Sequence, residues 1–362
     1  MSTNIHRICF LPHIRVVIIP EFIEYVNKFE ILGLTETHLG DLDTVNIEGY
    51  RIRVKNRGVN ASDGGIALVF KENLEEYFTE IESNCEYVYW AKFNSKGLGL
   101  HKDLIIGVIY IPPTSSKYSN EEAFEQIDDD LARVNNGNTI LMGDWNSHTG
   151  SRSDLADSLD IVNANMILND NGDDEIEVVN EVLNELNDEE KFRENNIQIL
   201  RVSNDKTKVD PYGQKLLDLV HNHSIYIANG RCGEDKILGK CTYLDKTTVD
   251  YVMLSFDLLC KVNDFKVKDF NPLYSDKHNA IEFSLGMNYV DKKEANNIIN
   301  ETGKNLTPTE PLPKWDSSKQ DEFIENMNAI IEQLSHEGSN DVEKESKELK
   351  DVLTNVLKVH LG

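Results

Sequence analysis

The amino-acid sequence predicts an α/β fold, a sandwich of mixed β-sheets and helices. Short apolar runs rich in Ile, Val and Leu recur along the chain, and amphipathic helical segments lie between several of them. Other neighbouring runs follow each other directly, as the strands of hairpins do. A chain that has both kinds of connection is typical of mixed sheets covered by helices.

The expected elements can be placed in order along the chain. A first helix is expected over residues 20–29, where apolar side chains recur on one helical face. Ser119 is expected to begin a second helix, because Glu122 three residues later completes a capping box. A third helix is expected over 213–220. Strands are expected over 30–34, 64–70, 86–93, 103–110, 139–142, 223–229, 249–255 and 280–285. No strand is expected in the first twenty residues.

Composition separates two further parts of the chain from this core. Residues 151–200 carry 14 acidic and 3 basic side chains, and their apolar residues show no periodicity. We therefore expect a long solvated insertion outside the core over about 151–212, with a helix near 176–186. After residue 288, a segment rich in Pro and Thr precedes two amphipathic helical patterns. The expected organisation is one domain over 1–288, followed by a linker and C-terminal amphipathic helices over 289–362.

Net charge and cysteine usage narrow the class of protein. The formal net charge of −26 is unusual for a nucleic-acid-binding protein. The five cysteines have no paired spacing, which favours a reducing compartment and gives no zinc motif. The apolar run 8–20 is short and is interrupted by His13 and Arg15, so it predicts neither a membrane span nor a signal peptide. We expect an intracellular protein, nuclear or cytoplasmic, that is not attached to a membrane.

Polar side chains that suit catalysis stand at the ends of five expected strands. They are Glu36, Tyr110, Asp144 with Asn146, Asp250, and Asp276 with His278. Each has a structural alternative, such as a turn cap for Asp144, a core position for Tyr110 or a surface position for His278. Carboxylates that converge at one end of a sheet repel one another unless a cation holds them. Oxygen ligands of this kind favour magnesium or manganese over zinc.

Five short motifs around these residues resemble the endonuclease/exonuclease/phosphatase superfamily. They are LTETHL at 34–39, GVIYIPP at 107–113, GDWN at 143–146, VDYVMLS at 249–255 and SDKHNAI at 275–281. Two longer stretches, 216–231 and 233–253, are similar to the apurinic-type endonuclease domain of non-LTR retrotransposons. The resemblance covers about residues 21–287.

This resemblance implies a four-layered α/β sandwich, with two mixed β-sheets flanked by helices, and metal-dependent cleavage of DNA phosphodiester bonds. By matching motif, Glu36 would ligate Mg²⁺ or Mn²⁺, with Asp276 close to it. No polymerase motif of the YxDD type occurs, so we expect an endonuclease of a retrotransposon-derived protein without a reverse transcriptase part. DNA is the expected partner, and the sequence indicates no protein partner.

The same resemblance implies roles for the other five residues. Either Asp144 or His278 would activate the attacking water, and the sequence does not decide between them. Asp250 would orient the histidine and stabilise its charge. Asn146 and Tyr110 would bind and polarise the scissile phosphate.

Two departures from the superfamily pattern bear on these expectations. Members begin with a strand that ends in an Asn near the metal, and the first twenty residues lack such an N-x-N-G pattern. Lys277 separates Asp276 from His278, where most members read Ser-Asp-His, so one extra residue must be absorbed locally. Two alternatives therefore stay open, namely a phosphatase or phosphodiesterase of the same superfamily and a catalytically degenerate relic.

Overall fold

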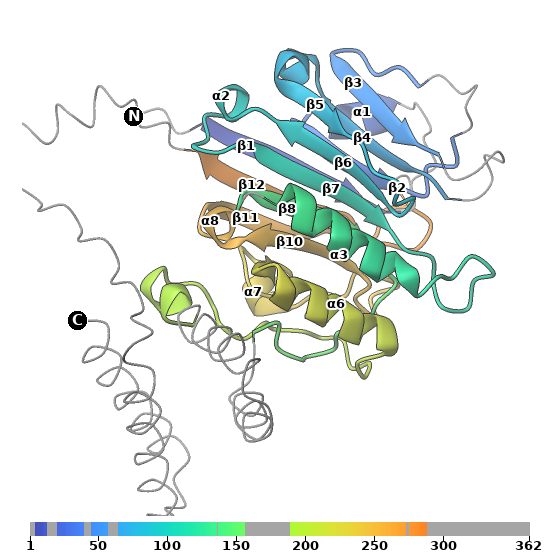
Figure 1. Cartoon of the computed structure of the whole chain (residues 1–362), viewed down its shortest axis with the longest axis vertical. Coiled ribbons are helices and arrows are strands. Elements are labelled where there is room, and N and C mark those ends of the chain that lie inside the picture. Colours follow the sequence, from blue (N-terminus) through green and yellow to red (C-terminus); the bar gives the residue numbers. More distant parts are fainter. Residues whose placement is uncertain are drawn as a thin grey trace, which may run out of the picture. The chain divides into compact units, whose positions relative to one another are not determined.

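Two mixed β-sheets of six strands each face one another in the computed structural model of the chain (Figure 1). The structure describes residues 4–12, 20–39, 45–56, 64–135, 137–155, 189–272 and 275–287, all within one unit, Met1–Tyr289. The first sheet has the order β11-β12-β1-β2-β4-β3 and consists of β1 (Asn4–Leu11), β2 (Ile31–Thr35), β3 (Tyr50–Lys55), β4 (Ile66–Lys71), β11 (Val262–Val267) and β12 (Ile281–Met287). The second has the order β5-β6-β7-β8-β10-β9 and consists of β5 (Phe78–Ile81), β6 (Val88–Phe93), β7 (Leu104–Tyr110), β8 (Thr139–Asp144), β9 (Ile225–Ile227) and β10 (Asp250–Ser255).

Helices cover the outer faces of the two sheets. Helix α1 (Pro20–Val26) packs on the first sheet, and α3 (Glu122–Val134) and α6 (Pro211–Asn222) lie across the second (Figure 1). Short helical turns connect other elements: η1 (Glu72–Tyr77), α2 (Ser95–Leu98), α7 (Asp235–Leu238) and α8 (Phe256–Leu259). Among the helices that the structure describes, none has the length and apolar character needed to cross a membrane.

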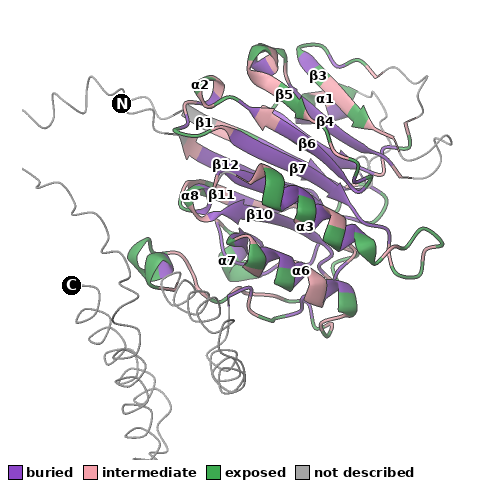
Figure 2. Cartoon of the chain, viewed as in Figure 1, coloured by how far each residue is buried: buried purple, intermediate pink, exposed green. Residues whose placement is uncertain are grey.

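Three buried apolar clusters hold these layers together (Figure 2). The largest lies between the sheets and joins Phe10 and Phe283 of the first to Ile106 and Met142 of the second. The other two lie between each sheet and its helices. Burial of this apolar surface on three levels is the main stabilising force for such a stack. The predicted four-layered α/β sandwich is therefore confirmed.

The expectation that the first twenty residues contain no strand was wrong. Strand β1 lies in the middle of the first sheet, parallel to β2 and antiparallel to β12. Its side chains alternate, so that Ile8 and Phe10 join the core between the sheets while Cys9 and Leu11 join the cluster under α1. Polar residues at its start obscured this alternation in the sequence. The sheet therefore has a first strand, which ends at Leu11 and is followed by Pro12, so the Asn expected from the resemblance is absent at this strand end.

The predicted capping box of the second helix was also wrong. Helix α3 begins at Glu122, and Ser119 belongs to the preceding turn, where its amide donates to the Ser116 carbonyl at 3.0 Å. The side chain of Asn120 accepts the Glu122 amide at 2.9 Å instead. Glu121, the residue that immediately precedes α3, makes no side-chain cap.

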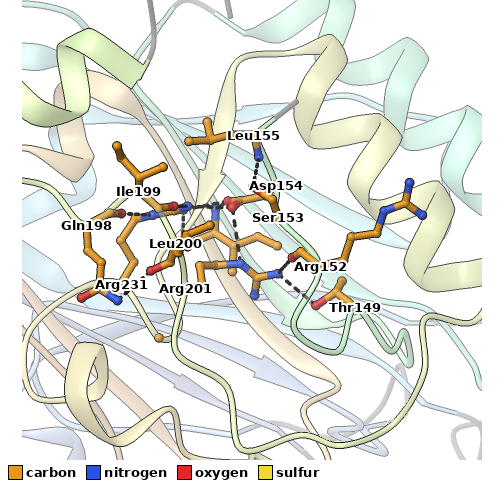
Figure 3. Close-up of polar contacts among 12 residues, drawn as sticks. Thr149, Arg152, Ser153, Asp154, Leu155, Gln198, Ile199, Leu200, Arg201 and Arg231 are labelled. Atoms are coloured by element: carbon orange, nitrogen blue, oxygen red, sulfur yellow. Dashed lines mark hydrogen bonds and ion pairs between the residues drawn. The ribbon is translucent and has the colours of Figure 1, made fainter. Parts of the chain in front are cut away.

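The described ends of the predicted acidic insertion belong to the core. Asp154 is fully buried, and its carboxylate accepts two hydrogen bonds of 2.7 Å from the guanidinium group of Arg231 (Figure 3). A second guanidinium, that of Arg201, lies 3.4 Å from the same carboxylate, and the Ile227 amide of β9 donates to it at 2.8 Å. Phe192 is completely buried and packs edge-on against Tyr226 at 4.8 Å between ring centroids.

The boundaries 151–212 of the solvated insertion were therefore too wide. Residues 151–155 and 189–212 include side chains buried in the fold, Asp154, Phe192 and Asp205, which composition alone does not reveal. Residues 156–188, with the helix predicted near 176–186, lie outside the described residues. So does 288–362, with the predicted linker and C-terminal helices.

Candidate active site

Strand register places three of the predicted site residues in one row across the second sheet. Asp144, the last residue of β8, pairs with Tyr110 at the end of β7 and with Asp250 at the start of β10. Directly opposed residues on neighbouring strands point to the same face. That face packs against the first sheet, because Val108, two residues before Tyr110 on the same strand, belongs to the core between the sheets. The three polar side chains therefore close one end of that core.

Glu36 reaches this row from the first sheet. It follows β2 directly and has a positive φ of 48°, a backbone conformation that turns the chain sharply after the strand. The hydroxyl of Tyr110 donates a hydrogen bond to Oε1 of Glu36. His38 has its Nε2 3.7 Å from the other oxygen of the same carboxylate, and its side chain is 41% exposed. The structure thus joins Glu36 and Tyr110, which come from different sheets.

Asp250 and His278 form a buried pair. Nδ1 of His278 lies 2.8 Å from Oδ2 of Asp250, and the two side chains are 2% and 0% exposed. The ring of Tyr243 packs edge-on against the imidazole with centroids 4.8 Å apart. A hydrogen bond from Nδ1 to the carboxylate leaves Nε2 as the nitrogen that can act on a substrate.

The extra residue Lys277 is absorbed in the turn before His278. The hydroxyl of Ser275 accepts hydrogen bonds from the amides of both Lys277 and His278, at 3.4 and 3.1 Å. This tight turn leaves Asp276 and Lys277 exposed and directs His278 into the protein. The structure therefore brings His278 to Asp250, whereas Asp276 stands on the surface of the loop.

Asn146 holds the carboxylate of Asp144. Its backbone amide donates to Oδ1 of Asp144 and its side-chain amide to Oδ2, each at 3.0 Å. The same side chain donates to the carbonyl of Ile111 at 2.8 Å, and Asn146 has a φ of 46°. Gly143, just before Asp144, allows β7 to approach, since a Cβ there would lie 2.3 Å from the Ile109 carbonyl oxygen. The predicted role of Asn146 in binding phosphate stays a prediction.

The ionisable side chains of Asp144, Asp250 and His278 are close enough to affect one another's protonation. Single donor atoms of Asp144, Asp250 and His278 all lie within 4.8 Å of one another, and all three residues are buried. Burial raises the pKa of Asp250, the imidazole of His278 opposes that rise, and the nearby carboxylate of Asp144 adds to it. A histidine and two carboxylates so close together suit a site that moves a proton beside a negative charge.

The donor set also suits a hard cation. Among the described residues, Asp144, Asp250 and His278 are the group of potential metal ligands that lie together, and carboxylate oxygens are what Mg²⁺ and Mn²⁺ prefer. Nδ1 of His278 is already bonded to Asp250, which favours a proton-handling role for that pair. The predicted ligands Glu36 and Asp276 are not members of this group, so their role stays a prediction.

Several residues around the site were not predicted from sequence. Tyr243 packs against the imidazole of His278 and Ser275 accepts a hydrogen bond from the His278 amide, and no feature of the sequence marks either residue. His148, in the glycine-flanked loop after β8, is another residue that the sequence did not single out. Its amide donates to Asp210 at 3.2 Å, and its Nδ1 lies 3.8 Å from the buried carboxylate of Asp205. Partners 57 and 62 residues away give no local sequence signal.

Comparisons with known proteins agree with this architecture. No family model matches the chain, and no curated protein matches it. Among solved structures, the chain is similar to the AP endonuclease LMAP from Leishmania major, with a TM-score of 0.51 and 10% identity over 78% of this chain and 88% of that one.

The chain has the fold of an AP endonuclease. The predicted resemblance to the endonuclease/exonuclease/phosphatase superfamily is thus confirmed at the level of the fold. Two further similar structures are the endonuclease domain of TRAS1, a telomere-specific non-LTR retrotransposon, and an AP endonuclease from Archaeoglobus fulgidus. Their TM-scores are 0.48 and 0.46 and their identities 13% and 11%, and each covers 77% of this chain and 98% of its own.

Proposed function

We propose that the chain is a metal-dependent phosphodiester hydrolase that cuts DNA, the endonuclease of a retrotransposon-derived protein. The observation that carries this proposal is the buried Asp250–His278 pair. Asp250 is the strand neighbour of Asp144, and Tyr110, on the other side of Asp144, donates a hydrogen bond to Glu36. Hydrolysis of a phosphodiester needs a base for the water and positive charge for the developing dianion. This set of side chains can supply both.

Glu36, with Asp276, would hold the metal, Mg²⁺ or Mn²⁺. When bound there, a divalent cation supplies positive charge to the phosphate oxygens in the transition state. Tyr110 supports this role, because its hydroxyl donates to Oε1 of Glu36 and so helps to orient the carboxylate. The predicted role of Tyr110 in polarising a phosphate oxygen would require its hydroxyl to turn from Glu36 to the substrate, because a phenol has one proton to donate.

Asp144 and His278 are the two candidates for the base. Asp144 is held by two hydrogen bonds from Asn146, so its orientation is fixed before substrate arrives. Asp250 fixes the Nδ1 side of His278, which leaves Nε2 to accept a proton when neutral or to stabilise phosphate charge when protonated. A pH–rate profile of each single variant separates these roles, since loss of the base removes one limb of the profile.

The choice of DNA over a smaller phosphate ester follows from the stretch 216–253, which is similar to retrotransposon endonuclease domains. The alternative of a degenerate relic was motivated by the missing first strand. Strand β1 removes that motive, because the sheet that carries Glu36 is complete around it.

Incubation of the purified full chain with supercoiled plasmid tests the proposal. We expect nicked and then linear DNA with Mg²⁺, and no conversion in EDTA. The variant Asp144→Asn keeps the shape of the side chain and should be inactive under both conditions. Cleavage that persists in EDTA would contradict metal dependence. Intact plasmid together with phosphate release from an inositol phosphate would instead favour the phosphatase alternative.

A further inference from the structure

A histidine outside the proposed catalytic set is held rigidly beside it. His148 follows Asn146 by two residues, and its side chain is 25% exposed. Its amide donates to Oδ1 of Asp210, and the Asp210 amide donates to the His148 carbonyl, both at 3.2 Å. Its Nδ1 faces the carboxylate of Asp205 at 3.8 Å. The imidazole therefore has a fixed inner edge and an accessible outer edge.

Asp205 links this histidine to the strand that carries Asp250. The buried carboxylate of Asp205 accepts the Thr248 amide at 2.8 Å, two residues before Asp250. Its other oxygen accepts the Thr207 amide at 2.8 Å. His148 and Asp205 thus connect the loop after β8, the strand that ends in Asp144, to the start of β10, where Asp250 lies.

In the segment 205–210, which has the sequence DKTKVD, the acidic side chains are engaged inside the protein and the lysines lie on the surface. Its two acids are engaged inside the protein, Asp205 as described and Asp210 as the cap of α6, where it accepts the Gly213 amide at 2.6 Å. Its two lysines, Lys206 and Lys208, are exposed. In a chain with a net charge of −26, this segment presents a basic surface next to the proposed active site.

We propose that His148, Lys206 and Lys208 form a second phosphate-binding site, which holds the DNA backbone beside the scissile phosphate. This inference rests on the proposed function as a DNA endonuclease. An acidic protein repels DNA at long range, so cations must be gathered where the backbone lies. Three side chains that can be cationic, on the loop after β8 and on the segment 205–210 that contacts it, suit an extended polyanion. Contacts of this kind position DNA without reading its sequence.

Protonation of His148 makes the site sensitive to pH. The charged groups that face the imidazole are Asp205 and Asp210. The carboxylate of Asp205, 3.8 Å away, raises the pKa of His148, and partial burial opposes the rise. Although burial disfavours the charged form of Asp205, the nearby imidazole of His148 and a hydrogen bond from the Thr248 amide lower its pKa to about 2. His148 should therefore stay cationic to a higher pH than a free histidine, and its contribution to DNA binding should fall as the pH rises further.

Binding of the full chain to a fluorescent DNA duplex in EDTA, where no cleavage is expected, tests the site. The variant Lys206→Gln/Lys208→Gln should flatten the slope of log K against log salt by about 0.9 for each lost contact. The same relation weakens binding roughly eightfold per contact at 0.1 M salt. The control Lys28→Gln/Lys96→Gln removes two exposed lysines that precede β2 and β7, at the strand ends opposite Glu36 and Tyr110. It should leave slope and affinity unchanged.

The histidine is tested by two substitutions over the pH range 5.5 to about 8.5 that surrounds an ordinary histidine pKa. His148→Asn should lower affinity at the acid end and abolish the pH dependence, while His148→Arg should abolish the dependence and keep the affinity high. If the parent protein nicks and binds DNA while all these variants match it, the inference is wrong and the proposed function stands. If the parent neither nicks nor binds DNA, both fail. If the Lys28→Gln/Lys96→Gln control lost as much DNA affinity as Lys206→Gln/Lys208→Gln, the inference would also be wrong. The loss would then reflect the total charge of the protein and not a local site.

Discussion

Substitution of Asp154 by Asn should destabilise the protein strongly. Asp154 and Arg231 have fully buried side chains, and the carboxylate accepts two parallel hydrogen bonds from the guanidinium group (Figure 3). The remaining N–H groups of Arg231 donate to the carbonyls of Gln198, Ile199 and Ile227 at 2.6 to 2.8 Å. All five donors of this guanidinium are therefore satisfied, and its ion-pair partner among the described residues is Asp154, a carboxylate that it shares with Arg201.

The magnitude follows from the burial of the charges. Removing one partner of a buried ion pair leaves an uncompensated charge and costs about 3–5 kcal/mol. Here Asn keeps the shape of the side chain but leaves two guanidinium groups facing each other, so the upper part of that range is expected. The loss is a large fraction of the ~5–15 kcal/mol by which domains are usually stable. The exposed pair Glu189–Arg193, with side chains 41% and 67% exposed, provides the control. Glu189→Gln should cost at most about 0.5 kcal/mol.

Urea unfolding followed by circular dichroism at pH 7 measures both variants against the parent. The arginines hold the pKa of Asp154 well below its usual range, despite the opposing effect of burial. A lowered folded-state pKa contributes stability above the unfolded-state value near 4, and this stability is lost as the pH falls through the folded-state value. The difference between parent and Asp154→Asn should therefore shrink toward acid pH. A loss below about 1 kcal/mol at pH 7, or one that grows as the pH falls, would refute the reasoning.

Three further outcomes are expected. Glu36→Gln removes a proposed metal ligand and should abolish Mg²⁺-dependent nicking without changing the urea midpoint; undiminished nicking would remove Glu36 from the proposed site. Asp250→Asn combined with His278→Ala should nick little more slowly than His278→Ala alone, because groups that act as one unit are not additive. Additive losses would mean that the pair acts separately. Replacing 156–188 by a short Gly-Ser linker removes ten acidic and no basic residues, so DNA binding should strengthen; weaker binding by a folded variant would show that this segment contacts DNA.

Sequence patterns predicted the fold where burial leaves a local signature. The apolar runs of β7 and β8 are buried along their whole length and were found directly. Strand β1 was missed because it begins with polar residues and is buried on both faces only after Arg7. The ends of the acidic insertion were misjudged for a related reason. A buried carboxylate such as Asp154 looks like any surface acid until its partner 77 residues away is known.

The candidate site likewise contains residues that local sequence patterns predict and residues that they do not. Strand ends placed Tyr110, Asp144 and Asp250, because register follows from strands that could be recognised. The residues that orient them lie on loops, and loop geometry depends on contacts between distant parts of the chain. Tyr243 and Asp205 are examples, since neither belongs to a periodic segment. The exposed position of Asp276 depends on one serine hydroxyl in a turn, which no spacing rule predicts.

The nicking rate of His278→Ala, measured beside that of His38→Ala, tests the central claim most directly. Both histidines lie near proposed site carboxylates, but His278 is buried against Asp250 whereas His38 is 41% exposed beside Glu36. Loss of a general acid or base lowers a rate by at least ~100-fold. We therefore predict such a loss for His278→Ala at a temperature and pH where the variant is still folded, and a far smaller effect for His38→Ala. A His278→Ala protein that nicks plasmid near the parent rate, while His38→Ala is inactive, would contradict the account.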